Sequence, residues 1–444
     1  MQTQSKAHST WTVWGISELG GWLGHRNPTC GLPSGHDAED CLDAHLARGI
    51  RHVVWDLGRS VLTYHSDLPG ALCIGLRPEP GHLTAADHKA GYKARALEAM
   101  YRERCQLRAA LRHARANRMT LYGRLCMNRH YSPGSSHRGN FAQNHPQWCE
   151  VGWDGWLDPS RLCYGIPEVR RERIAIFLEA ANIGVDGLHL DFCRQPPIVR
   201  YHPAFVNGYR ERFERDPREL ALTQLDTEGA RPYLNWCAWR AEAVTDLLRE
   251  LKAELDPFRI RWQRSVPVQV RVPNDGFEAN LIAGLDVQTW CREGLIDELA
   301  LSELRWLREY RQWDDGPYIA LGQEYGIPVY ASSNCLPLQG GEWSGEVNPR
   351  GINPLVLARR ALRSYEAGAQ GVALYQSDTG IQWPGVGDAV AVMSNPEHLR
   401  AYVNAPETVA RYPVTAENVD FGIDNHSAAF AQFHIGPGKE GGRA

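Results

Sequence analysis

The sequence predicts an α/β protein: a (β/α)8 TIM barrel with long βα loops and a short C-terminal appendage. Short apolar or β-branched runs alternate with longer helical stretches about eight times, which is typical of repeated βα units around a parallel sheet. A glycine stands just before several of these runs, as in IGVDGLHL, YGIPVY and GAQGVALY. None of the predicted strands is followed by GxGxxG or a P-loop, so a closed barrel is favoured over an open doubly wound sheet.

The predicted strands are short runs bounded by turn-forming or polar residues. The first is TVWGI and the second is RHVVWDLG, and each is followed by glycine-containing or polar sequence. The strands are predicted, in chain order, at residues 12–16, 51–58, 119–130, 186–193, 266–272, 296–303, 327–333 and 371–377.

Helices are predicted between the strands. The first begins near His36 and Asp37 and ends at Gly49, because glycine is a common residue at the end of a helix. The helix at residues 167–182 is closed by Gly184 in the same way. The remaining helices are predicted at residues 85–117, 203–216, 230–255, 278–293, 316–325 and 354–367.

Two long loops, at residues 20–35 and 131–167, are rich in glycine and proline. The second is too long for a plain connector, and long structureless loops inside compact domains are usually functional. Many of the 15 tryptophans also lie in predicted loops, where they either pack over the barrel or stack on sugar rings. These are Trp22, Trp148, Trp153, Trp156, Trp313, Trp343 and Trp383.

The composition is that of an ordinary globular enzyme, with 43% hydrophobic and 23% charged residues. A net charge of −4 gives no reason to expect nucleic acid or a membrane as the main partner. No segment approaches the roughly 18 apolar residues that span a bilayer. The N-terminal residues lack the apolar core of a secretory signal, so a cytoplasmic location is expected. Eleven cysteines without a CxxC pair are expected to be reduced thiols.

The length of 444 residues exceeds the roughly 250 of a typical barrel, which leaves room for insertions. Residues 1–400 are expected to form the catalytic barrel. Residues 401–444 are expected to form the appendage, with the last of them disordered. The oligomeric state stays open.

The fourth predicted strand carries the sharpest functional signal. In DGLHLDFCRQPP, His189 and Asp191 are two residues apart and therefore project to the same side of the strand. An inward-facing carboxylate at a strand end is unfavourable unless it is solvated, paired or used in catalysis. Catalytic groups of TIM barrels lie at the C-terminal ends of the strands, which makes Asp191 the leading candidate. The alternative is an Asp held by Arg194 or by nearby loop amides.

This strand, with the preceding helix RERIAIFLEAANIGV, resembles the fourth strand of family 10-like glycosyl hydrolases and related bacterial barrel proteins. The stretch LDVQTWCREGLIDELALSE is similar to a helix and the sixth strand of the same proteins. The chitinase-like DGxDxDxE signature is not met. The resemblance implies a glycosidase acting on an oligosaccharide or glycoside. The pattern G-hydrophobic-H-hydrophobic-D-aromatic-x-R-x-P is matched by Gly187, Leu188, His189, Leu190, Asp191, Phe192, Arg194 and Pro196.

Most glycoside hydrolysis uses two carboxyl groups, one ionised and one protonated. Asp191 is predicted to be the nucleophile or base. Glu303, at the end of the sixth strand, is predicted to be the acid, and the α-galactosidase clan similarly divides its pair between strands four and six. Asp275, after the fifth strand, is the rival acid, or else part of an ordinary Asn-Asp-Gly turn. No organic cofactor is expected.

Several other strands end in residues that can form hydrogen bonds, which suits a polyhydroxylated ligand. Each could instead be paired with a neighbour for structural reasons. The predicted substrate-binding residues are Asp56, Arg59, Arg124, Asn128, His130, His189, Arg194, Tyr375 and Asp378.

Two other classes of function stay open. His189 and Asp191 could hold a divalent metal ion in a sugar isomerase or hydrolase, because His-x-Asp on one strand presents two ligands to one side. A carbohydrate-binding barrel without activity is the third class. No metal is assigned, because the strand ends do not define a complete ligand set.

Overall fold

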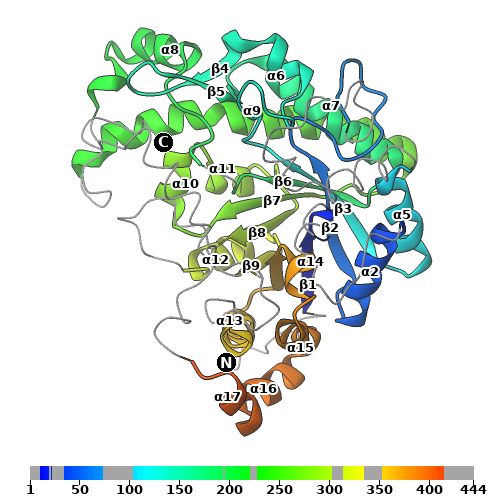
Figure 1. The fold of residues 1–444 in the computed structure, drawn as a ribbon. Coiled ribbons are helices and arrows are strands. Elements are labelled where there is room, and N and C mark those ends of the chain that lie inside the picture. The colour runs from blue at the N-terminus through cyan, green and yellow to red at the C-terminus, as the bar shows by residue number, and fades with distance from the viewer. Residues whose placement is uncertain are drawn as a thin grey trace.

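The computed structural model describes residues 11–19, 22, 35–73, 104–193, 196–220, 228–302, 314–334 and 353–414. Within them, eight parallel strands close into a barrel in the order β1-β10-β9-β8-β7-β6-β3-β2 (Figure 1). The chain is therefore a (β/α)8 TIM barrel, which confirms the predicted fold class and each predicted strand. The strands are β1 Thr12–Ser17, β2 His52–Gly58, β3 Thr120–Cys126, β6 Gly187–Asp191, β7 Val268–Pro273, β8 Glu298–Ser302, β9 Val329–Asn334 and β10 Gly371–Tyr375.

Alternation along the strands fills the barrel interior with large side chains. Trp14 of β1 lies against Tyr122 of β3, with their ring centroids 4.5 Å apart, and against Tyr330 of β9 at 5.9 Å. Smaller residues, including Ala300 and Ala373, occupy facing positions on other strands. Large aromatic side chains thus pack the interior of the barrel beneath the C-terminal strand ends.

Helices surround the strands, mostly where the sequence predicts them. Of the predicted helix at 85–117, the described residues contain α5 (Gln106–Ala116). The predicted helix at 278–293 is two helices, because Gly284 between them has a φ of 93° and ends the first. The outer helices are α2 Asp37–Ala47, α5 Gln106–Ala116, α7 Pro167–Ile183, α9 Arg231–Trp262, α10 Phe277–Ala283, α11 Val287–Arg292, α12 Gly316–Tyr325 and α13 Pro354–Glu366.

The predicted loop at 131–167 is not structureless. It contains the short helix α6 (Asn140–Asn144) and an antiparallel pair, β4 (Cys149–Val151) and β5 (Leu157–Leu162). Together with α8 (Pro203–Phe213), these elements lie on one side of the barrel (Figure 1). This insertion extends the C-terminal face beyond β3.

The end of the described chain packs against the barrel through three further helices, α15 (Pro384–Met393), α16 (Pro396–Asn404) and α17 (Pro406–Arg411). The predicted domain boundary between residues 400 and 401 lies inside α16. Leu399 and Val403 on either side of it are both buried in the main hydrophobic core. Residues 415–444 lie outside the described residues.

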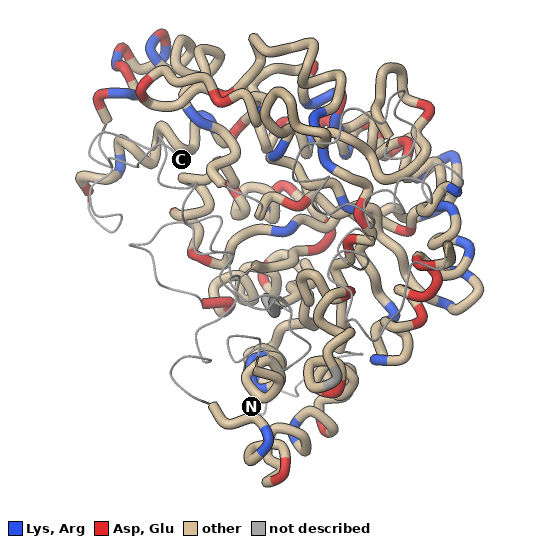
Figure 2. The backbone as a smooth tube through the Cα atoms, in the orientation of Figure 1, with Lys and Arg blue, Asp and Glu red and all other residues tan. Residues whose placement is uncertain are grey.

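Acidic and basic positions are interspersed over the described fold, in keeping with its near-balanced composition (Figure 2). No helix in the described part of the chain is long and apolar enough to cross a membrane. The nine cysteines that fall within the described ranges are all free thiols.

Candidate active site

Arg124 is the centre of a charged cluster at the C-terminal end of the barrel. It projects inward from β3 and is fully buried. Its Nε donates to Oδ2 of Asp191 at 2.7 Å, and its Nη1 donates to Oδ1 of Asp56 at 3.0 Å and to Oε1 of Glu18 at 2.7 Å. One guanidinium therefore joins the ends of β1, β2, β3 and β6.

Asp191, the last residue of β6, is held by a second arginine. Nη1 of Arg271, on the neighbouring strand β7, lies 3.3 Å from both of its carboxylate oxygens. The N–H of Cys193 donates to Oδ1 at 3.0 Å. Burial alone would raise the pKa of Asp191, but the guanidiniums of Arg124 and Arg271 hold it well below its ordinary value. Asp191 is thus a carboxylate that stays ionised throughout the neutral range.

Arg271 connects Asp191 to two more strands. Its Nη2 donates to Oγ of Ser302, the last residue of β8, at 2.5 Å. Its guanidinium carbon lies 4.1 Å from the ring centroid of Tyr375, the last residue of β10, in a cation–π contact. The planar contact on one side and the hydrogen bonds on the other fix the orientation of the arginine.

Glu18 and Asp56 lie on the opposite side of Arg124. Arg59 donates from Nη2 to both oxygens of Glu18, at 3.0 and 3.1 Å. Burial raises the pKa of Asp56 to about 6; nearby Glu18 also raises it, and Arg59 and Arg124 oppose the shift. Asp56 and Asp191 therefore have carboxyl groups whose pKa values are pushed in opposite directions, a pattern typical of acid and base pairs.

His189 lies one layer below Asp191 in the barrel. Its Nδ1 is 2.6 Å from Oε1 of Gln269, whose Nε2 donates to Glu298 at 2.7 Å. Glu298 also accepts from the hydroxyl of Tyr122 at 2.9 Å. Burial lowers the pKa of His189 to about 3, so its imidazole is neutral. These side chains form a polar chain inside the barrel, beneath the charged cluster.

The structure brings together five of the predicted site residues. Asp56, Arg59, Arg124 and Asp191 belong to the ion-pair network around Arg124, and Tyr375 covers Arg271. Glu303 and Arg194 lie outside the described residues.

Three other predicted residues lie away from this network, and a fourth, Asp378, lies beside Glu18. His130 accepts from the N–H of Leu162 in β5 at 3.3 Å, and Asn128 lies beside Cys126. Asp275 is fully buried in the turn between β7 and α10. Asp378 is fully buried at the start of α14 (Ser377–Gly380), where burial and Glu18 raise its pKa well above the usual range.

Sequence reasoning missed Glu18 and Arg271. Glu18 directly follows β1 and fits the strand-end rule, whereas Arg271 is the single charged residue inside the apolar run VPVQVRV. Arg271 shares its side of β7 with Gln269 by the two-residue alternation of a strand. Arg271 lies two residues before Pro273, the last residue of β7, so a rule restricted to strand ends does not include it.

A metal ion at His189 and Asp191 is disfavoured by the charges around them. Arg124 and Arg271 place two positive guanidiniums on the carboxylate that a cation would need. Across the described ranges, no three or more His, Cys, Asp or Glu side chains are grouped so that they could hold a metal.

The insertion beside the site contains an acid whose ionisation opposes folding. Glu150 of β4 is fully buried, and burial raises its pKa to about 7, although Arg200 opposes the shift. A raised carboxyl pKa stabilises the fold below the unfolded pKa, and this stability is lost as the pH rises toward 7. Glu150→Gln cannot ionise. As the pH rises from 4 to 8, we therefore expect the unfolding free energy of wild type to fall by about 2–3 kcal/mol relative to that of Glu150→Gln.

Urea denaturation of both proteins at pH 4 and pH 8 measures this difference. Glutamine retains the oxygen that accepts the N–H of Arg200, which Oε2 accepts at 3.1 Å in the wild type. The same pH dependence in both proteins would show that Glu150 does not titrate in this window.

Of three comparisons with known proteins, only the comparison with solved structures finds similar proteins. No family model matches the sequence, and no curated protein matches it either. A β-galactosidase from the psychrophilic Marinomonas ef1 is similar in structure, with a TM-score of 0.51 and 10% identity, over 88% of this chain and 60% of that chain. An α-L-fucosidase isoenzyme 2 from Paenibacillus thiaminolyticus has a TM-score of 0.48 and 12% identity, over 89% of this chain and 51% of that chain.

This chain thus spans 51% and 60% of the length of these two solved proteins. At 10% identity the likeness to the β-galactosidase shows the fold and nothing more specific. The predicted relationship to family 10-like glycosyl hydrolases in particular finds no support in the comparisons.

Proposed function

We propose that this chain hydrolyses O-glycosidic bonds at the C-terminal face of its barrel. The observation that carries the proposal is Asp191, an inward carboxylate at the end of a barrel strand that two arginines keep ionised. A glycosidase needs such a carboxylate, either to attack the anomeric carbon or to activate the attacking water. The β-galactosidase that shares the barrel is a glycosidase by name, which is consistent with the proposal.

The arginines set what Asp191 can do. They keep Asp191 ionised and hold it in one orientation, so that the carboxylate can face the sugar carbon on which positive charge develops without any rearrangement during the reaction. Asp56, Arg59 and Tyr375 surround the same position and offer hydrogen-bonding groups to sugar hydroxyls. The proposed substrate is an oligosaccharide or glycoside, and the chemistry needs no organic cofactor.

The proposed acid is Glu303. It directly follows Ser302, whose hydroxyl contacts Arg271, and Arg271 contacts Asp191. Asp275 is the second candidate. Asp56 is a third, because a pKa of about 6 leaves part of its population protonated near neutral pH.

Substrates with different leaving groups separate the three acids. Replacement of the acid, as Glu303→Gln, is expected to slow hydrolysis of alkyl glycosides about 10²–10³-fold, because the leaving alcohol then departs without a proton. The same variant should hydrolyse 2,4-dinitrophenyl glycosides nearly as well as wild type, since that leaving group needs no protonation. Asp275→Asn and Asp56→Asn are the matched comparisons. If one of them shows this split and Glu303→Gln does not, the acid is that residue instead.

The proposal as a whole is tested by sugar release from a panel of oligosaccharides and aryl glycosides. The panel is run with EDTA and with added divalent cations, and the purified protein is analysed for bound metal. Release that EDTA does not affect supports the carboxylate mechanism. Release that requires a cation favours the metal-dependent alternative, and tight sugar binding with no turnover under any condition favours the binding protein.

A further inference from the structure

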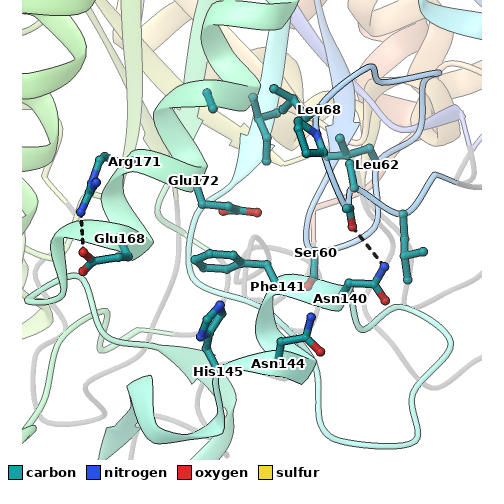
Figure 3. A pocket seen from close by; sticks show the side chains of 16 residues that line it. Ser60, Leu62, Leu68, Asn140, Phe141, Asn144, His145, Glu168, Arg171 and Glu172 are labelled. Carbon is teal, nitrogen blue, oxygen red and sulfur yellow. Dashed lines mark hydrogen bonds and ion pairs between the residues drawn. The ribbon is translucent and has the colours of Figure 1, made fainter.

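A pocket of about 510 Å³ opens among the segments that follow the C-terminal ends of β2 and β3 (Figure 3). Three segments line it: residues 60–72 after β2, α6 with His145, and the N-terminal half of α7. All three follow the C-terminal ends of β2 or β3, where TIM barrels bind their substrates. The volume is typical of a small-molecule site.

The pocket has an apolar floor and an aromatic side. Leu62 and Ile176 are buried beneath it. The ring of Phe141 lies between the carboxylate of Glu172 and the ring of His145 (Figure 3). His145 in turn stacks on Trp148, with ring centroids 3.8 Å apart and planes at 9°. A rigid aromatic surface of this kind suits the flat apolar face of a sugar ring.

The rim of the pocket offers neutral hydrogen-bonding groups. The amide of Asn140 donates to the carbonyl of Gly70 at 3.1 Å and keeps its own oxygen at the rim. Asn144 is exposed, and its side-chain amide forms no hydrogen bond within the described part of the chain. Neutral amides can both donate to and accept from sugar hydroxyls.

The charges at the pocket cancel. Glu168 is paired with Arg171, and Glu172 accepts from Nη2 of Arg173 at 2.6 Å. Each carboxylate therefore already has its own cation. A charged ligand would gain no free counter-ion from these pairs, whereas an uncharged ligand meets no repulsion.

The pocket and the charged cluster share a wall. Arg59 binds Glu18 in the cluster, and the next residue, Ser60, lines the pocket. Arg173 donates to the carbonyl of Arg59 at 2.5 Å and also holds Glu172. Because consecutive Cα atoms are about 3.8 Å apart, one short backbone segment carries both the Arg59 contact to the cluster and the Ser60 contact to the pocket.

We propose that this pocket is a distal subsite that binds an uncharged sugar unit of the substrate, beyond the bond that is cleaved. The proposal rests on the proposed function, and it makes the substrate a neutral oligosaccharide rather than an anionic one. Phe141 provides the stacking surface, and Asn144 provides hydrogen bonds to the hydroxyls.

The test compares short and long substrates in variants of the pocket. Asn144→Ala and Phe141→Leu are expected to hydrolyse aryl monosaccharides like wild type, while kcat/KM for a neutral oligosaccharide of four to six units falls about tenfold. Asn182→Ala is the matched control, because Asn182 is an exposed asparagine that lines a separate cavity at the other end of α7. Phe141→Leu keeps an apolar side chain but removes the aromatic face.

Calorimetric binding of the same neutral oligosaccharides separates this proposal from the proposed function. If wild type binds them without turnover and Asn144→Ala weakens the binding, the pocket is a sugar site although the chain is no glycosidase. If turnover occurs and chain length affects wild type and both variants equally, the subsite is refuted while the glycosidase stands. Preference for acidic oligosaccharides over neutral ones also overturns the proposal, as does the absence of any binding or turnover.

Discussion

Asp191→Ala is expected to reduce glycoside hydrolysis about 10⁴-fold or more, and added azide is expected to restore part of the loss. The variant lacks the carboxylate that attacks the anomeric carbon or activates water there. Azide is small enough to enter the vacated space and attack the same carbon, while the leaving group departs with its proton from the acid. The product is a glycosyl azide of inverted configuration, which NMR identifies directly.

Azide rescue distinguishes a catalytic role of Asp191 from a structural one. Removing its charge leaves two buried arginines without their common partner, so some loss of stability accompanies the loss of activity. Asp158 is a matched control, because it is also a buried carboxylate between two arginines, with Arg161 at 3.4 Å and Arg200 at 3.1 Å. Asp158→Ala should be destabilised to a similar degree but should keep its activity per folded molecule. Equal activity in wild type and Asp191→Ala, or a retained configuration in the azide product, removes Asp191 from the role of nucleophile or base.

Local signals explain why most of the fold could be predicted. The strands are apolar runs beside glycines, and α7 ends at Gly184 with a φ of 116°, as its sequence indicates. The division between α10 and α11 also had a local signal, since Asp286 caps α11 by accepting the N–H of Thr289 at 3.1 Å. The pair β4–β5 had none. Its second strand, LDPSRL, contains a proline and only modest β-propensity, and its pairing depends on contacts from other parts of the chain.

The candidate site was predictable only as a set of positions. The rule that catalytic groups lie at strand ends leads to Asp56, Arg124 and Asp191 from the sequence alone. It does not show which charges meet, because Arg124 is 67 residues from Asp191 along the chain, and Arg271 is 80 residues from it. The protonation states of the carboxyl groups depend on which charged side chains the fold places beside them. Asp56 and Asp191 are both aspartates at strand ends, yet their pKa values move in opposite directions. At Asp56, burial and Glu18 outweigh Arg59 and Arg124, whereas at Asp191 the guanidiniums of Arg124 and Arg271 outweigh burial.

Arg124→Met is expected to lower the unfolding free energy by about 3–5 kcal/mol at neutral pH. Arg124 is fully buried and is hydrogen-bonded to Glu18, Asp56 and Asp191 at once. Methionine fills much of the volume, but it leaves these carboxyl groups without the cation that links them. Removal of one partner from a buried ion pair costs more than replacement of the whole pair by apolar residues, because the remaining charge stays buried.

The loss in Arg124→Met should shrink as the pH falls. In wild type, the lowered pKa of Asp191 contributes stability above its unfolded pKa, and this contribution is lost only as the pH falls through its low folded pKa. Without Arg124, that contribution is smaller, and the pKa of Asp56 moves further above 6, so the ionised form of Asp56 opposes folding more strongly. The Asp56 effect acts at pH 7.5 and weakens toward pH 4.5, where Asp56 is protonated in both proteins. The Asp191 effect persists at pH 4.5, because that pH still lies above the pKa of about 3.9 of an unfolded aspartate. Urea denaturation at the two pH values, which adds no salt, therefore measures the part of the loss that comes from Asp56.

Arg124→Lys separates the charge of Arg124 from its geometry. Lysine keeps one positive charge, but its ammonium cannot reach across three carboxyl groups as the planar guanidinium does. Its stability should lie between that of wild type and Arg124→Met at pH 7.5, with a weaker dependence on pH than the methionine variant shows. Equal stability of wild type and Arg124→Met at pH 7.5 would mean that water reaches the cluster and screens the carboxylates. Asp191 would then no longer depend on buried arginines for its charge, and its lowered pKa would lose its physical basis.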